Sequence, residues 1–134
     1  MMKYALSLVV FGSLFLTGGD ASAKSSSFQK SCSGIDLDIT DQDVWIVADC
    51  GDGNGRFVNT RIELRGINNG HGFLNKKGNG ASSFQRSCDD IYLEWNDFSV
   101  KLNARCDNGN GGVNQTFLYI NNIENRFGTL RKTR

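Results

Sequence analysis

The feature that most constrains this chain is an internal repeat. The heptapeptide at residues 26–32 returns at residues 82–88 with a single Lys-to-Arg exchange. Residues 26–75 align with residues 82–131 without a gap, at an offset of 56, and 20 of the 50 aligned positions are identical. Two copies are too few for a solenoid. The pattern therefore predicts a tandem duplication whose halves complete one another around a pseudo-twofold axis.

Within each copy, apolar residues occur at every second position. In repeat two, residues 91–95 and 100–106 alternate in this way on either side of a turn signal at residues 96–97. Successive side chains of a strand point to opposite faces, so the alternation predicts strands with one buried face. Repeat one follows the same scheme, and a third apolar run in each copy, at residues 61–64 and 117–120, predicts a third strand.

The expected fold is all-β. No run of ten or more residues shows helical spacing, and the 16 Gly and 14 Asn disfavour helix. We expect each repeat, residues 26–75 and 82–131, to form a triple-stranded antiparallel sheet plus a β-hairpin, with short 3-10 turns near residues 28–29 or 68–69. The Gly-rich linker at residues 76–81 should be flexible. Such a hinge permits strand exchange between halves or between molecules, so the expected state is a monomer or a domain-swapped dimer.

Some aromatic residues have expected positions. Phe28 and Phe84 precede a Cys at equivalent places in the two copies and are expected in the core. Alternation places Trp95 on the buried face of its strand. Trp45 falls on the face opposite Val44, where it could be an exposed platform or could pack between the halves.

The first 23 residues predict a secretory signal peptide. Lys3 precedes an apolar run over residues 4–16, and Ala21-Ser22-Ala23 is a small-x-small cleavage site. The run is too short for a membrane span, so no membrane insertion is expected. The predicted mature domain is residues 24–134, and the predicted location is extracellular.

Four cysteines follow this leader. In exported chains paired cysteines become disulfides. The equal intervals Cys32–Cys50 and Cys88–Cys106 favour one bridge inside each repeat, each closing a loop of about 19 residues worth about 3 kcal/mol on the chain-entropy model. A crossed pairing of Cys32 with Cys106 and of Cys50 with Cys88 also respects the symmetry. No two cysteines have the two-to-four-residue spacing typical of zinc ligands, so neither a metal nor another cofactor is expected.

Charge and catalytic motifs argue against several functions. The net charge is +1 and no basic cluster lies among aromatics, so nucleic acid is not an expected partner. His71 is the only His, which excludes a two-His acid–base pair, and no G-x-S-x-G nucleophile motif is present. A non-enzymatic protein is expected. A small glycan hydrolase remains an alternative, because two carboxylates suffice for that chemistry.

The doubled motif order resembles one known family. Phe-x-x-Ser-Cys, two alternating strands, Cys, a Gly/Asn loop and a closing Ile-x-Asn-x-x-Gly-x-Leu motif occur twice, the last at residues 67–74 and 123–130. This order resembles the cyanovirin-N homology (CVNH) family over nearly all of residues 26–132. The resemblance implies an elongated pseudo-symmetric β protein in which each half takes a hairpin from the other repeat. It also implies a metal-free lectin for mannose-rich glycans and glycoproteins, often with two sites at opposite ends.

Two pockets follow from the resemblance, each named here by its loop. The Cys50-loop site maps onto Ser27, Lys30, Ser31, Gly51, Asp52, Gly53, Asn125, Arg126 and Phe127. The Cys106-loop site maps onto Asn68, Asn69, Gly70, His71, Ser83, Arg86, Ser87, Asp107, Asn108 and Gly109. Their polar groups suit a sugar, because a pocket matched to hydroxyl groups leaves buried polar atoms unpaired when the wrong stereoisomer enters.

Other roles for these residues remain open. The Asn and Gly residues could serve turn geometry alone, and Asn69 and Asn125 could hold their own turns. His71 and Phe127 stand where the family often has an acidic residue, and Phe127 could stack on a sugar or belong to the core. A secreted interaction or effector protein that has lost sugar binding is therefore the alternative function.

Overall fold

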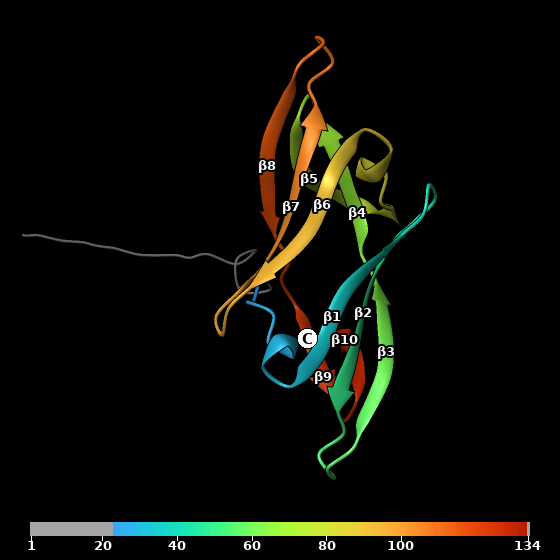
Figure 1. Cartoon of the computed structure of the whole chain (residues 1–134), viewed down its shortest axis with the longest axis vertical. Coiled ribbons are helices and arrows are strands. Elements are labelled where there is room, and N and C mark those ends of the chain that lie inside the picture. The colour runs from blue at the N-terminus through green and yellow to red at the C-terminus, as the bar shows by residue number, and fades with distance from the viewer. Residues whose placement is uncertain (1–22, 134) are drawn as a thin grey trace, which may run out of the picture.

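The computed structural model describes residues 23–133 and confirms the all-β fold (Figure 1). The predicted signal peptide, apart from Ala23, lies outside the described residues. Repeat one contains a triple-stranded sheet of β1 (Cys32–Ile39), β2 (Val44–Gly51) and β3 (Phe57–Glu63), followed by the hairpin of β4 (Arg65–Gly70) and β5 (Phe73–Ala81). Repeat two contains the sheet of β6 (Cys88–Trp95), β7 (Val100–Asp107) and β8 (Val113–Tyr119), followed by the hairpin of β9 (Ile123–Arg126) and β10 (Thr129–Lys132).

The two repeats exchange their hairpins. The β4–β5 hairpin of repeat one packs on β8 of repeat two, and the β9–β10 hairpin packs on β3 of repeat one (Figure 1). Two equivalent hydrogen bonds join these layers. The backbone N–H of Leu74 donates to Thr116 Oγ1 at 3.2 Å, and that of Leu130 donates to Thr60 Oγ1 at 3.1 Å. Each half of the molecule is thus completed by the other repeat.

The core is built twice from equivalent residues. The central strands β2 and β7 bury alternate side chains, and Phe28 and Phe84 are fully buried as predicted. Period-two alternation of apolar residues therefore gives each sheet its inner face. The other core members also come in pairs 56 residues apart: Leu64 and Ile120, Ile67 and Ile123, and Leu74 and Leu130.

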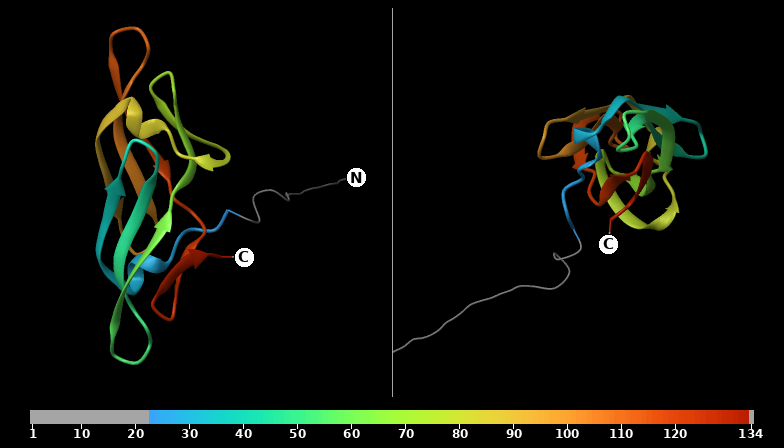
Figure 2. Two further views of the ribbon diagram at one scale, coloured as in Figure 1. Left: turned by 90° about the vertical axis from the view of Figure 1, so that its right-hand side faces the viewer. Right: turned by 90° about the horizontal axis from the view of Figure 1, so that it is seen from below.

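Each repeat closes its own disulfide. Cys32 bonds to Cys50 and Cys88 bonds to Cys106, and each pair lies directly opposite across two neighbouring strands. The crossed alternative is excluded. The bridges fix the first two strands of each sheet and leave the loops after Cys50 and Cys106 at opposite ends of the long axis (Figure 2).

Several local predictions were wrong. Trp95 is 44% exposed although Val100, its partner across the hairpin, is buried, because β6 is the edge strand of its sheet and only one side of the residue has a neighbouring strand. Its equivalent Ile39 lies on the edge strand β1 and is 39% exposed. The 3-10 turn expected near residues 28–29 is confirmed as Phe28–Lys30, with its equivalent at Phe84–Arg86, but the one considered at residues 68–69 is wrong, because those residues belong to β4. Residues 76–81, predicted as a flexible linker, continue β5.

Trp45 takes the outer-face position that its alternation predicts. It is half-buried, and the guanidinium carbon of Arg61 lies 4.2 Å from its ring centroid. This stacking on the outer face of the sheet covers the ring, so Trp45 is not a bare platform. None of the helices in the described part of the chain is long and apolar enough to cross a membrane.

Candidate functional site

Each site begins with the tight turn of an exchanged hairpin. Gly70 pairs with Phe73 and Arg126 pairs with Thr129, so both loops contain only two residues. His71 and Gly72 have φ of 54° and 97°, and their equivalents in repeat two have φ of 53° and 94°. Positive φ at both positions is what a type I′ hairpin turn requires. The residue before the glycine is thereby presented at the tip, where His71 is exposed.

The amide of Asn69 fixes the first of these turns to the opposite repeat. Its Nδ2 donates to Ser87 Oγ and to the backbone carbonyl of Asp107, both at 2.9 Å. Its Oδ1 accepts from the backbone N–H of Gly72 at 2.7 Å. Both donor hydrogens of the amide are therefore used within the protein. The prediction that Asn69 holds its own turn is confirmed, and the same side chain also joins the two repeats.

Asn125 makes the equivalent contacts at the other end. Its Nδ2 donates to Ser31 Oγ and to the carbonyl of Gly51, both at 2.9 Å, and its Oδ1 accepts from Gly128 N–H at 2.8 Å. The two amides place one closing turn and one Cys loop side by side at each end of the molecule. The predicted association of residues far apart in sequence is thus present at both ends.

Asp52 and Asn108 hold their loops in shape. Asp52 Oδ1 accepts from the backbone N–H groups of Asn54 and Arg56, at 2.7 and 3.3 Å. Asn108 Oδ1 accepts from the equivalent groups of Asn110 and Gly112, at 2.8 and 3.2 Å. A short polar side chain that bonds backbone groups ahead of it is a turn former. These two side chains therefore stabilise the conformation of the Cys loops that form the sites.

A pocket of about 290 Å³ lies at the Cys106-loop site. Asp107 is its acidic side chain, and one carboxylate oxygen accepts from Gly109 N–H at 2.8 Å. The second oxygen and the exposed His71 imidazole complete a set of groups that could bind hydroxyls. The lining is Asn69, Gly70, His71, Ser87, Asp107 and Gly109.

The Cys50-loop site differs at two positions. Gly51 stands where Asp107 stands in the other site, so this end lacks the equivalent carboxylate. Phe127 replaces His71 and is 76% exposed, which excludes a core position for its ring. A Cβ at Gly53 would lie 3.9 Å from Cδ1 of Phe127, so the ring edge borders the loop. This end therefore presents an aromatic ring where the other presents the His71 imidazole, and it has no equivalent of the Asp107 carboxylate.

Comparison with protein families identifies this doubled architecture. The model of the CVNH domain matches residues 28–131. The chain belongs to the CVNH family. None of the functionally curated sequences compared with this chain matches it.

Solved CVNH structures share the fold at low sequence identity. The NMR structure of GzCVNH from Gibberella zeae is 25% identical, with a TM-score of 0.57 over 81% of this chain and 98% of that one. TbCVNH from T. borchii is 28% identical, with a TM-score of 0.60 over 80% and 99%. Microvirin, solved as a complex with mannobiose, is 26% identical, with a TM-score of 0.59 over 80% and 98%.

Other predicted site residues of this CVNH chain lie beside the pockets. Arg86 Nε donates to the carbonyl of Asp41 at 2.8 Å, which ties it to the β1–β2 turn of the other repeat. The backbone N–H groups of Ser27 and Ser83 bond to carbonyls of the closing motifs. Asn68 pairs with Asn75 within the hairpin. Lys30 and Arg126 are exposed.

The sequence reading missed one polar feature of this CVNH domain. A hollow of about 310 Å³ adjoins the Cys106-loop pocket and shares Ser87 and Asp107 with it. On its floor, Arg105 Nε and Nη2 donate to the two Asp89 oxygens at 3.0 and 3.2 Å, and this pairing lowers the pKa of Asp89. The signal was available, because these residues flank the bonded cysteines with opposite charges in a Cys-Asp and Arg-Cys pattern.

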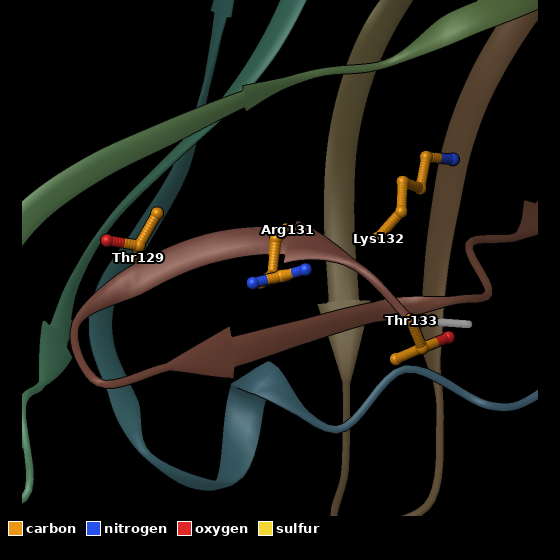
Figure 3. Close-up of a pocket in the computed structure, with 4 residues that line it drawn as sticks. All are labelled: Thr129, Arg131, Lys132 and Thr133. Atoms are coloured by element: carbon orange, nitrogen blue, oxygen red, sulfur yellow. The ribbon is translucent and has the colours of Figure 1, made fainter.

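Another hollow lies away from both loop sites. It measures about 630 Å³ and is lined by Thr129, Arg131, Lys132 and Thr133 (Figure 3). Its lining residues come from β10 and the residue that follows it, and none of them is a predicted site residue. Within residues 23–133, no three His, Cys, Asp or Glu side chains gather as a metal site requires.

Proposed function

We propose that this chain is a secreted, non-enzymatic lectin that binds mannose-type oligosaccharides at the Cys106-loop site. One observation carries the proposal: Asn69 from repeat one and Asp107 from repeat two meet in a single pocket whose acidic group keeps a free oxygen. Membership of the CVNH family supports the lectin class. The solved complex of microvirin with mannobiose supports the mannose type.

The chemistry of the pocket suits a neutral sugar. A hexose presents vicinal hydroxyls, each able to donate and accept a hydrogen bond. The Asp107 carboxylate accepts from such hydroxyls, and bonds to a charged acceptor are the stronger kind. The Asn69 network holds the wall of the pocket in place before the ligand arrives, so little ordering is required on binding.

The Cys50-loop site is proposed as a weaker second site. Gly51 removes the carboxylate equivalent to Asp107, and the exposed Phe127 ring offers an apolar surface for the C–H face of a sugar. The two loop sites lie at opposite ends of the molecule (Figure 1). Two neighbouring glycans of a cluster could therefore bind to the two ends of one protein molecule. Binding of the first raises the effective concentration of the second, and this raises the overall affinity.

A glycan array on the oxidised protein tests the proposal. Binding to mannosides is expected, and Asp107→Asn should weaken it about tenfold, as loss of a charge-assisted hydrogen bond does. Asp97→Asn, in the exposed β6–β7 turn, is the matched control and should bind as the parent does. An array without mannoside binding would contradict the proposal, and release of reducing sugar from a bound glycan would contradict its non-enzymatic part.

An interaction protein is the second candidate, because the two outer sheet faces differ. Tyr92, Phe117 and Tyr119 are each about half exposed on the sheet of repeat two. Their equivalents on repeat one are Asp36, Arg61 and Glu63. Aromatic residues of this kind are enriched in protein interfaces. A protein partner whose capture resists excess mannose and is lost in Phe117→Ser would favour this function.

A further inference from the structure

A cavity of about 360 Å³ lies between the repeats, away from both loop sites. None of its lining residues belongs to either site. Part of its wall consists of aliphatic side chains from the two repeats, which are Leu64, Ile67, Leu118, Ile120 and Ile123, and Tyr119, Asn121 and Asn122 complete it beside the cationic residues described below. The chain enters the described structure beside this cavity, since Ala23 is part of its rim.

The cavity lies across the pseudo-twofold axis. Lys76 and Lys132 are 56 residues apart, the offset of the repeat, and both line it. Each lysine pairs across its hairpin with the equivalent isoleucine, Ile67 for Lys76 and Ile123 for Lys132. The Lys132 side chain leaves β10 on the side opposite to Thr133 (Figure 3). The duplication has therefore placed two equivalent ammonium groups at one cavity.

The positive charge of this cavity is not balanced inside it. Among the described residues, no Asp or Glu lines the cavity, and none forms an ion pair with Lys76 or Lys132. Arg65, the third cationic lining residue, is already bonded to Glu63 at 2.8 Å and to the carbonyl of Asn79 at 2.7 Å. Burial, followed by repulsion from Lys76, lowers the pKa of Lys132. An anion between the two lysines would relieve that repulsion.

The amino end of the mature chain adds to this charge. The backbone nitrogen of Lys24 donates to Asn122 Oδ1 at 2.8 Å, and Asn122 lines the cavity. Cleavage after Ala23, as the sequence predicts, would convert that nitrogen into an α-ammonium group. Export would thus add a further cationic group, beside Lys76, Lys132 and Arg65, near the same rim.

We propose that this central cavity binds an amphipathic carboxylate, with its head group between Lys76 and Lys132 and its hydrocarbon chain on the aliphatic wall. A concave site with a mostly apolar lining and a few convergent polar groups is the usual form of a small-molecule site. The carboxylate supplies the missing negative charge. The chain covers aliphatic surface that a hydroxyl-rich sugar would leave without hydrogen bonds.

Binding of dodecanoate below its micelle concentration tests the proposal by NMR. The methyl signals of Ile67, Ile120 and Ile123 should shift on titration into the purified, oxidised protein. Lys132→Gln and Lys76→Gln should each weaken dodecanoate binding about fivefold to tenfold, because each removes one charge contact at close range. Lys77→Gln is the matched control, since the neighbouring lysine is exposed and is absent from the lining.

Each other outcome overturns the proposal. If Lys77→Gln weakened dodecanoate binding as much as the two cavity variants, the carboxylate would be attracted by the overall positive charge and not by this cavity. If dodecyltrimethylammonium bound as tightly as dodecanoate, the two lysines would not select a negative head group. Shifts at Ser87 and Asp107 in place of the isoleucines would place the ligand at the Cys106-loop site. Mannobiose binding should be unchanged in Lys76→Gln and Lys132→Gln, so the lectin proposal and this one succeed or fail separately.

Discussion

Replacing Asn69 with Ala should destabilise the protein and abolish binding at the Cys106-loop site together. The side chain makes three hydrogen bonds, to Ser87 Oγ, to the Asp107 carbonyl and from Gly72 N–H. A typical hydrogen bond contributes about 1 kcal/mol net, which gives about 3 kcal/mol for the set. Because the amide is only half-buried, water replaces part of this, and we expect a loss of about 2 kcal/mol.

Urea unfolding followed by tryptophan fluorescence measures this loss. With a denaturant slope of about 1.3 kcal/mol per molar, the midpoint should fall by about 1.5 M. Asn125→Ala should cost a similar amount, and the double variant about 4 kcal/mol, because the two networks lie at opposite ends and share no partner. Asn54→Ala, at an exposed loop tip, is the control and should stay within about 0.5 kcal/mol of the parent.

The reasoning fails if Asn69→Ala and Asn54→Ala are equally stable. It also fails if Asn69→Ala keeps full mannobiose affinity after losing stability, since the amide would then hold the turn without shaping the pocket. Amide exchange separates the two roles. The Gly72 N–H should exchange faster in Asn69→Ala, whereas the Gly128 N–H should not change.

Three further predictions follow from single contacts. Gly72→Ala should lower the free energy of unfolding by about 1–3 kcal/mol, measured by thermal unfolding, because φ is +97° and the new Cβ would lie 2.5 Å from Asn114 Nδ2. Gly80→Ala is the control and should leave the stability almost unchanged, because no atom lies within 4 Å of the new Cβ. Changing both cysteines of repeat two to Ser should cost about 3 kcal/mol in urea unfolding, and unchanged stability would contradict the loop-closure argument. Lys132→Met should raise the melting temperature at neutral pH, because it removes a partly buried charge repelled by Lys76. The folded-state pKa of Lys132 is lowered, so the stability gained in Lys132→Met is complete below that pKa and decreases as the pH rises toward the ordinary pKa of lysine. A stability gain that increases with pH would contradict the lowered pKa of Lys132.

The repeat and its alternation were enough to predict the duplicated three-stranded sheets and their hairpins, because alternation reports which face of a strand is buried. The exchange of hairpins between the repeats was predicted only from the resemblance to the CVNH family. Phe28 and Phe84 could be assigned to the core since they hold equivalent positions in both copies. Trp95 could not be placed correctly. Alternation indicates which face a side chain takes, but it does not indicate whether its strand lies at the edge or in the centre of the sheet, and Trp95 lies on the edge strand β6.

The site was predictable as an association of segments and less so as chemistry. The resemblance brought Asn69 together with Asp107, and the structure agrees. The amide of an Asn can form hydrogen bonds with a sugar or with the backbone through the same atoms, so the sequence does not decide between the two. In the structure, Asn69 and Asn108 both accept hydrogen bonds from backbone N–H groups. The central cavity could not be predicted for another reason. Lys132 lies one residue beyond the aligned repeat at residues 82–131, so the alignment does not pair it with Lys76.

The exchanged hairpins have a consequence for how such a chain could have arisen. A polypeptide of half this length would leave its last two strands without the partner sheet on which they dock. It could satisfy them only by pairing reciprocally with a second copy, so the ancestor that this geometry implies is a twofold homodimer. Fusing two genes in tandem turns that concentration-dependent encounter into closure of one loop. In one fused chain the two ends no longer need to be identical, and here equivalent positions hold Gly51 at one end and Asp107 at the other.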